Sequence, residues 1–149
     1  MPAENLLANT FSLPVRVYWE DTDAGGVVYY ANYLRFYERA RSEWLRARGV
    51  LQQKLAEESG ILFVVRSVNV DYLRPAILED DLVVTAAVSD VKRASFEMVQ
   101  DVRRNGELLS KATVKVACIS RDTGRPCPLP ETVLAVISAP QNNPCIRDI

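Results

Sequence analysis

Residues 31–48 read ANYLRFYERARSEWLRAR, the longest helical pattern in the chain. Its apolar residues recur every three or four positions, which places them on one stripe of a helix. The stripe consists of Tyr33, Phe36, Tyr37, Ala40, Trp44 and Ala47. Charged residues fill most of the intervening positions, and Gly49 is a typical helix-terminating residue. The stretch therefore predicts one long amphipathic helix whose apolar stripe packs against another layer.

Alternation of apolar and polar residues on both sides of this helix predicts that second layer. One short strand is expected before the helix, over residues 13–19, with Val15, Val17 and Trp19 on one face. Further strands are expected after it, over residues 67–72, 82–91, 94–103 and 111–118. A second, short helix is expected over residues 51–59, whereas residues 130–137 fit either a short helix or a last strand.

The turns join these strands into one sheet. Asn105-Gly106 is the strongest hairpin signal, because both central residues of a type I′ turn need a positive φ. Consecutive strands with short turns form an antiparallel sheet. The predicted fold class is therefore α+β, an antiparallel sheet of about five strands wrapped around one long central helix. We expect residues 1–149 to be a single domain, with a loose lead-in over 1–12 and a frayed tail over 139–149.

The bulk composition narrows the function. The chain has 149 residues and a net charge of −1, which offers no basis for a nucleic-acid partner. No apolar run approaches the ~20 residues of a transmembrane helix. The first residues contain no basic stretch followed by an apolar block, so no signal peptide is expected. We therefore expect a cytoplasmic protein without membrane insertion.

Cysteine and histidine content restricts the chemistry further. Cys118, Cys127 and Cys145 lack the spacing of a metal knuckle or a redox pair, and we expect free thiols in a reducing cytosol. The sequence contains no histidine, which excludes Ser-His and Cys-His catalytic pairs and zinc sites built on His ligands. No metal and no cofactor are expected. Acid–base chemistry near neutral pH must come from carboxylates, Tyr, Lys, Cys or the backbone.

Residues 20–30 read EDTDAGGVVYY and place acids and two glycines directly before the long helix. A helix N-terminus carries unpaired N–H groups and a partial positive charge, and glycine lets a ligand approach the backbone. A carboxylate there can act as a base or nucleophile on a carbonyl whose oxygen the N–H groups hold. An acid at this place is more often a simple helix cap, and spacing alone does not decide between the two interpretations.

Residues 16–33, RVYWEDTDAGGVVYYANY, closely resemble the signature of 4-hydroxybenzoyl-CoA-type hotdog thioesterases, and among them the bacterial Tol-Pal-associated acyl-CoA thioesterases. The resemblance spans roughly residues 13–137 and recurs at 36–41 (FYERAR), 63–66 (FVVR) and 72–76 (YLRPA). It implies a hotdog fold and hydrolysis of an acyl-CoA thioester to free acid and CoA. It also implies a homodimer, or a homotetramer as in some relatives, with the active site at the subunit interface.

The resemblance also implies roles for particular residues. The catalytic carboxylate falls on Asp23, and the N–H group that polarises the thioester carbonyl falls on Tyr30. Gly26 and Val27 would lie beside that carbonyl. Many relatives have His where this chain has Tyr30. If that His assists catalysis in those relatives, lower activity or activity on other acyl groups is expected here; if the position acts only through its backbone, a Tyr side chain leaves the N–H in place. Lys92 and Arg93, in a turn between two strands, are the candidates for binding the CoA phosphates, and the same pair fits a solvated basic turn equally well.

The remaining acids near the turn have simpler interpretations. We interpret Asp21 as a turn-forming or solvated residue and Glu38 as a surface partner of Arg41 or Arg35. Trp44 and Phe96 are interpreted as core.

Two other functions are compatible with such a scaffold. A hotdog dehydratase would need a His, which this chain lacks. A non-catalytic acyl-CoA or acyl-carrier binder, or an interaction protein, is the alternative function. The intact Asp23 argues against that alternative, because a pure binder gains nothing from an anion beside the carbonyl.

Overall fold

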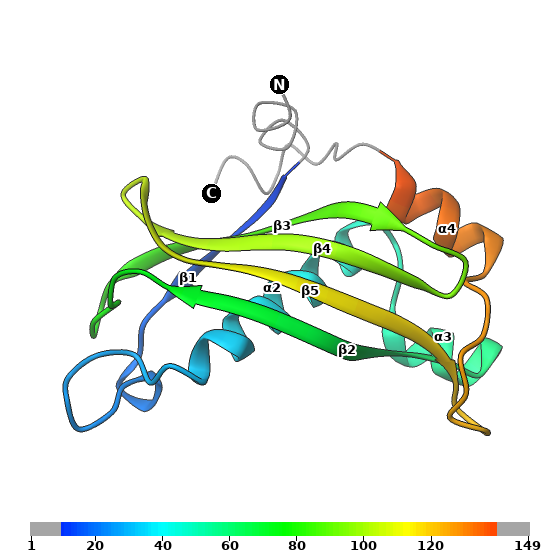
Figure 1. Cartoon of the computed structure of the whole chain (residues 1–149), viewed down its shortest axis with the longest axis horizontal. Coiled ribbons are helices and arrows are strands. Elements are labelled where there is room, and N and C mark those ends of the chain that lie inside the picture. Colours follow the sequence, from blue (N-terminus) through cyan, green and yellow to red (C-terminus); the bar gives the residue numbers. More distant parts are fainter. Residues whose placement is uncertain (1–9, 140–149) are drawn as a thin grey trace.

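The computed structural model describes residues 10–139, and in it one antiparallel sheet wraps around one long helix (Figure 1). The sheet has five strands in the order β1-β3-β4-β5-β2. They are β1 Phe11–Arg16, β2 Ile61–Tyr72, β3 Asp81–Val91, β4 Ser95–Arg104 and β5 Glu107–Ser120. The helices are α2 Asn32–Ala47, α3 Gln52–Ser59 and α4 Glu131–Ser138, and Trp19–Asp21 forms a 3₁₀ turn. The predicted α+β hotdog arrangement is confirmed.

The long helix α2 supplies one side of the core. Its predicted stripe is buried from Tyr33 to Trp44, and the Trp44 ring lies 6.1 Å from the ring of Phe96 on β4. Ala47 is exposed, because the stripe leaves the sheet at the last residue of the helix. The assignment of Trp44 and Phe96 to the core is confirmed. Hydrophobic burial of this stripe against the sheet is therefore what holds α2 in place.

The strand pairing follows the predicted turns. All four strand pairs are antiparallel, and the β4–β5 hairpin closes through Asn105 and Gly106, whose φ angles are 51° and 82°. These positive values confirm the type of turn that the Asn-Gly pair predicts. Strand β2 is longer than expected, because it begins at Ile61 immediately after Gly60. Strands β1 and β2 are the two edges of the sheet.

The N-terminal segment differs from the prediction. The lead-in expected over 1–12 is wrong for its last part, because Phe11 begins β1, pairs with Ala86 and is 1% exposed. Trp19 does not share a face with Val15 and Val17. The chain leaves the sheet after Arg16, so Trp19 lies in the 3₁₀ turn and is 79% exposed. The period-two pattern persists across this boundary although the strand does not.

The C-terminal segment is settled in part. Residues 131–138 form helix α4, which decides between the helix and strand alternatives. Val133 and Ile137 of α4 are buried in the core. The tail expected over 139–149 lies outside the described residues, apart from Ala139. Between residues 10 and 139, none of the helices has the length and apolar character needed to cross a membrane.

Buried polar groups tie α2 to the sheet. The Gln100 amide nitrogen donates to the carbonyls of Tyr37 (3.0 Å) and Thr85 (3.1 Å), and its oxygen accepts from Arg41 at 2.9 Å. Burial lowers the pKa of Arg41. The predicted surface pair of Glu38 with Arg41 or Arg35 is not among the ion pairs of residues 10–139. Glu38 accepts instead from the Ser42 hydroxyl at 2.6 Å. Arg41 therefore links α2 to the sheet through its hydrogen bond to Gln100.

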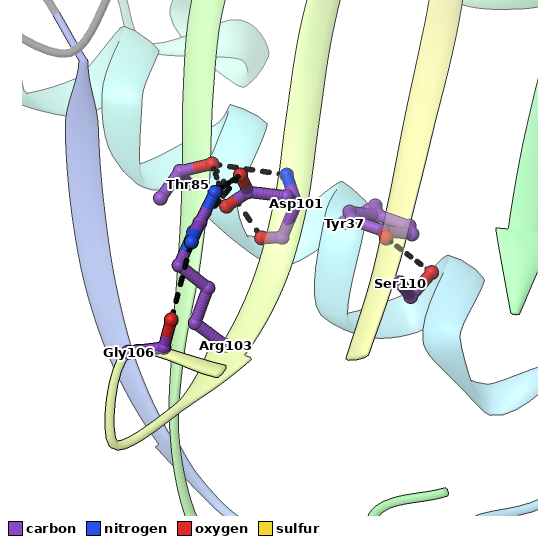
Figure 2. A network of polar contacts seen from close by, with 6 residues as sticks. All are labelled: Tyr37, Thr85, Asp101, Arg103, Gly106 and Ser110. Carbon is purple, nitrogen blue, oxygen red and sulfur yellow. Dashed lines mark hydrogen bonds and ion pairs between the residues drawn. The ribbon is translucent and has the colours of Figure 1, made fainter. Parts of the chain in front are cut away.

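A second polar network joins β3 to β4 (Figure 2). The Thr85 hydroxyl donates to the Asp101 carboxylate at 2.7 Å, and the Asp101 N–H donates back to the Thr85 oxygen at 2.9 Å. Arg103 pairs with Asp101 at 3.1 Å and donates to the Gly106 carbonyl at 3.3 Å. In the same view, the hydroxyls of Tyr37 and Ser110 lie 2.6 Å apart in the core. Satisfied groups of this kind fix the strand register without leaving orphaned polar atoms.

Candidate active site

A tight loop holds Asp23 just before α2, at one end of the sheet (Figure 1). The Asp23 N–H donates to the Val27 carbonyl at 2.9 Å, and the Gly26 N–H donates to the Asp23 carbonyl at 3.0 Å. Gly26 has a φ of 84°, a conformation that residues with a Cβ rarely adopt. The loop is therefore specified by its glycine as well as by its acids. It brings Asp23, Gly26, Val27 and Tyr30 into one short segment, as the predicted site requires.

The Asp23 carboxylate is exposed, and one of its two oxygens accepts a hydrogen bond. Its Oδ1 accepts the Gly25 N–H at 2.8 Å, while Oδ2 has no partner within residues 10–139. A Cβ on residue 25 would lie 3.2 Å from Asp23 Oδ1, so glycine leaves room for this close contact. One oxygen orients the side chain and the other is available to a substrate or a water molecule.

The two residues that lead into α2, Tyr30 and Ala31, have N–H groups without a hydrogen-bond partner among residues 10–139. The earliest backbone bonds of α2 run from Asn32 to the Tyr29 carbonyl at 2.8 Å and from Tyr33 to the Tyr30 carbonyl at 3.3 Å. Unpaired N–H groups at a helix start attract a developing negative charge. The N–H groups of Tyr30 and Ala31 are therefore candidates for holding a carbonyl oxygen.

The helix-cap interpretation of Asp23 is wrong. The N-cap position of α2 belongs to Ala31, which has no side-chain cap, and the Asp23 side chain bonds to Gly25 instead. A capping acid would accept from the first N–H groups of the helix. Within residues 10–139, the Asp23 carboxylate makes no hydrogen bond to the N–H groups of Tyr30 or Ala31.

Asp21 connects the loop to the helix, a role that the sequence analysis missed. Its Oδ1 accepts from the Asn32 side chain at 2.9 Å, and its Oδ2 accepts the Tyr18 N–H at 2.8 Å. Its backbone carbonyl accepts the Tyr29 N–H at 3.0 Å. Asn32 is buried, so its amide depends on this partner. Three contacts from one residue thus set where Asp23 lies relative to the start of α2.

Asp21→Ala is expected to lower the turnover of any reaction in which Asp23 takes part about 10-fold, because it releases the loop from the helix and misplaces Asp23. It also leaves the buried Asn32 amide without its acceptor, so unfolding should become easier by about 1–3 kcal/mol. Urea unfolding and steady-state kinetics measure the two effects. Asp122→Ala, in an exposed turn, is the control and should change neither. Unchanged kinetics in Asp21→Ala would remove its positioning role.

The segment after β2 supports the loop from outside. The Val28 N–H donates to the Ala76 carbonyl at 2.8 Å, and Val27 bridges to Ile77. The Ala76 N–H in turn donates to the Tyr33 hydroxyl at 3.1 Å. Burial raises the pKa of Tyr33, so this hydroxyl stays neutral and is a structural acceptor. The candidate site is therefore built on the sheet and the helix rather than on a free loop.

Aromatic rings form an exposed wall beside the site. The Tyr30 ring lies 5.0 Å from the ring of Tyr29 and 6.0 Å from that of Tyr72, at the end of β2. Tyr72 also packs edge-on against the buried Tyr33 at 5.3 Å. Tyr30 is 62% exposed, so its side chain faces outward while its N–H stays at the helix start. Exposed aromatic rings of this kind are typical of binding surfaces.

The other predicted residues lie elsewhere in the chain. Lys92 and Arg93 are in the β3–β4 turn, at the end of the sheet opposite the Asp23 loop (Figure 1). Within one chain the structure does not bring them to that loop. Glu38 lines a small cavity of about 90 Å³ between α2 and β2, together with Arg41, Trp44, Phe63 and Phe96. A more open hollow of about 490 Å³ lies over β2–β5 and contains none of the predicted site residues.

The fold and this loop define a class of protein. The sequence model of the thioesterase-like superfamily matches residues 17–137, and the chain belongs to that superfamily. It is 52% identical over 130 residues to the acyl-CoA thioesterase YbgC of Haemophilus influenzae, covering 87% of this chain and 96% of that protein. It is 44% identical over 126 residues to the acyl-CoA thioester hydrolase YbgC of Escherichia coli O6:H1, covering 84% and 93%.

A solved structure agrees with these sequence relatives. The probable thioesterase from Bartonella henselae superimposes with a TM-score of 0.77 at 38% identity, covering 81% of this chain and 99% of that one. The fold and family expected from residues 16–33 are therefore confirmed.

Proposed function

We propose that this protein is an acyl-CoA thioesterase that hydrolyses the thioester to a free acid and CoA, with Asp23 as its essential carboxylate. One observation carries the proposal. Within the described residues, Asp23 Oδ2 has no hydrogen-bond partner, and the same loop leads to the N–H groups of Tyr30 and Ala31, which also have none there. Membership of the thioesterase-like superfamily and similarity to two acyl-CoA thioesterases support the choice of substrate.

The proposed reaction uses only groups of the chain and water. The thioester carbonyl oxygen binds the Tyr30 N–H, with Gly26 and Val27 beside it. As a tetrahedral centre forms, that N–H stabilises the developing negative charge. Asp23 either removes a proton from an attacking water or attacks the carbonyl carbon itself. The C–S bond then breaks, and the sulfur leaves as the thiolate of CoA, which takes up the proton held by Asp23 or a proton from water. In the direct-attack route, water then hydrolyses the acyl anhydride on Asp23 and releases the free acid. No metal and no cofactor take part in these steps.

Release of free thiol from a panel of acyl-CoAs tests the proposal. The panel contains acetyl, butyryl, lauroyl, palmitoyl and 4-hydroxybenzoyl thioesters, which also identifies the acyl class. Hydrolysis of at least one thioester is expected. Binding of these thioesters without thiol release, by a folded protein, would favour the alternative of a non-catalytic acyl-CoA binder.

A single turnover in water labelled with heavy oxygen separates the two routes of Asp23. Direct attack forms a mixed anhydride, and its hydrolysis can place the label in the Asp23 carboxylate. General-base catalysis places the label in the released acid alone. Mass analysis of the peptide that contains Asp23 distinguishes the two outcomes.

We also propose that the protein forms a homodimer through the free edge of β2, the simplest of the homo-oligomers expected. Exposed apolar side chains follow this edge, among them Val64, Val65, Val68 and Tyr72. An open edge with apolar side chains is a ready template for another strand. Because Tyr72 contacts the Tyr30 ring, the edge ends at the candidate site. A partner paired along β2 would therefore cover one side of that site.

Such a dimer would give Lys92 and Arg93 a role. Antiparallel pairing of two β2 edges places opposite ends of the two sheets side by side. The β3–β4 turn of one chain would then lie toward the Asp23 loop of its partner, about 15 Å in from the edge at strand spacings of ~4.8 Å. CoA is long and carries phosphates, for which Lys and Arg are suitable ligands.

A double variant of Lys92 and Arg93 to Ala is expected to raise KM for acyl-CoA about 10-fold and to keep kcat within about twofold. The cause is loss of phosphate contacts that lie far from the thioester. An acyl-pantetheine thioester, which lacks the nucleotide phosphates, is the matched control and should show no rise in KM. Equal effects on both substrates would remove the phosphate role.

The location that we propose is the cytoplasm. Fractionation of the source cells, followed by detection of the protein, tests this, and recovery from an extracytoplasmic fraction would contradict it.

A further inference from the structure

Cys118 and Cys127 are brought side by side by the fold. Their Sγ atoms lie 3.7 Å apart, although the two residues are nine positions apart in the sequence. Cys118 is on β5 and is buried, whereas Cys127 is on the segment between β5 and α4 and is partly exposed. Their spacing did not indicate a redox pair. The turn at 121–123 reverses the chain and creates the contact.

The backbone frame around the two cysteines suits a covalent bond between them. Ile119 and Pro126 form an antiparallel bridge, which the Cys127 N–H extends by donating to the Cys118 carbonyl at 3.0 Å. Cys118 and Cys127 therefore occupy opposed positions of an antiparallel pair. Opposed residues have Cα atoms about 4.5–5.5 Å apart, which falls within the ~4.4–6.8 Å range of disulfides.

The remaining movement is small and local. A disulfide has sulfur atoms about 2.05 Å apart, so the two Sγ atoms must approach by roughly 1.7 Å. Side-chain rotation can supply this, because both flanks are held in place. The Cys118 N–H donates to the Ala94 carbonyl at 2.9 Å, and the Leu129 N–H donates to the Arg93 carbonyl at 2.8 Å.

The two thiols differ in their access to solvent. Burial raises the pKa of the Cys118 thiol to about 12 and keeps it protonated, away from dissolved oxidants. Cys127 is the partly exposed member, so it is the sulfur that a small oxidant meets first. This division between a reacting and a resolving cysteine is typical of thiol pairs that form disulfides.

We propose that Cys118 and Cys127 are a site of reversible oxidative modification, at which a low-molecular-weight disulfide such as oxidised glutathione converts the two thiols into an intramolecular disulfide. Cys127 attacks one sulfur of oxidised glutathione, the S–S bond breaks, and one glutathione leaves as its thiol. The Cys118 sulfur then attacks Cys127 Sγ, and its proton passes to the sulfur of the second glutathione, which leaves as a thiol. The protein loses two hydrogen atoms, and one glutathione disulfide becomes two glutathione thiols.

The disulfide would join the segment before α4 covalently to β5. This site lies at the end of the sheet opposite the Asp23 loop (Figure 1). It uses none of the residues assigned to hydrolysis. The proposal is therefore independent of the proposed function, and either one can fail without the other.

The test uses Cys145→Ser protein, so that only Cys118 and Cys127 can react. The protein is incubated with oxidised glutathione and measured by mass spectrometry, thiol titration under denaturing conditions and non-reducing peptide mapping. We expect both thiols to disappear, a mass about 2 Da lower, one linked peptide pair and full reversal by dithiothreitol. A lasting glutathione adduct on Cys127, or two thiols that persist, would overturn the proposal.

Two matched variants in the same background assign the steps. Cys118→Ala should keep glutathione on Cys127, because no second thiol displaces it. Cys127→Ser should leave the buried Cys118 unmodified. If either variant fails to fold, as judged by circular dichroism, the linked peptide in the parent protein still decides the proposal. Modification of Cys118 in the Cys127→Ser protein would contradict the order of attack.

Discussion

Asp23→Asn is expected to lower kcat for acyl-CoA hydrolysis by about 10²-fold or more, with the protein folded as before. An amide cannot accept a proton from water at neutral pH and is a poor nucleophile. Its carbonyl oxygen can still accept the Gly25 N–H bond, which Asp23 Oδ1 accepts at 2.8 Å. The loop geometry is therefore retained while the chemistry is lost. Thiol release under saturating substrate and a thermal melt measure the two properties.

Glu20→Gln is the matched control for Asp23→Asn. Glu20 is an exposed acid in the preceding 3₁₀ turn, and the substitution makes the same change of charge and chemistry three positions away. It should leave kcat within about twofold of the parent. Near-normal turnover in Asp23→Asn would remove the assignment of the carboxylate. Equal losses in both variants would mean that the charge of the whole turn, rather than Asp23, governs the rate.

Val68→Glu is expected to convert the proposed dimer into a monomer and to lower kcat/KM about 10-fold or more. Val68 lies near the middle of β2 and is 42% exposed. In a symmetric pairing of two β2 edges, residues near the middle lie close to their own copies, so two new carboxylates would face each other. Activity should fall as the molecular mass falls from dimer to monomer, because the partner chain would no longer cover the site beside Tyr72. Analytical ultracentrifugation and kinetics at the same protein concentration measure both.

Val83→Glu provides the comparison for Val68→Glu. Val83 is exposed to a similar degree, 40%, but lies on β3, away from the β2 edge. It should keep the mass and activity of the parent protein. If the parent protein is monomeric at all concentrations, the proposed dimer is wrong. A Val68→Glu monomer with full activity would keep the dimer but remove the need for a partner at the site.

The long helix and most strands could be predicted because their signals are local. The stripe from Tyr33 to Trp44 repeats with the period of an α-helix, and the Asn105-Gly106 pair meets a conformational need of its own turn. The end of β1 was harder to place. Val15, Val17 and Trp19 alternate regularly, which predicts a strand through Trp19. At Val17, however, the backbone bonds to Glu79 and Asp80 in the loop before β3, and the chain leaves the sheet there.

Some residues of the candidate site could be predicted from a local motif, and others could not. Asp23, Gly26 and Tyr30 belong to one continuous motif, so their resemblance to a family could place them from the sequence. Asp21 could not be assigned as the link to Asn32, because the two residues are 11 positions apart and lie in different elements. The end of the sheet that carries Lys92 and Arg93 depends on how β3 runs across it. No local pattern encodes that direction.

The fold class, the central helix and the motif that carries Asp23 can be read from the chain alone, because periodicity and turn chemistry act over a few neighbouring residues. Three features become visible in the folded molecule: the Asp23 carboxylate does not cap the helix, Asp21 holds the loop to Asn32, and Cys118 meets Cys127. These are contacts between segments that the chain must first bring together. They are set by burial and by the need of each polar group for a partner, and neither is visible until the sheet has closed around α2.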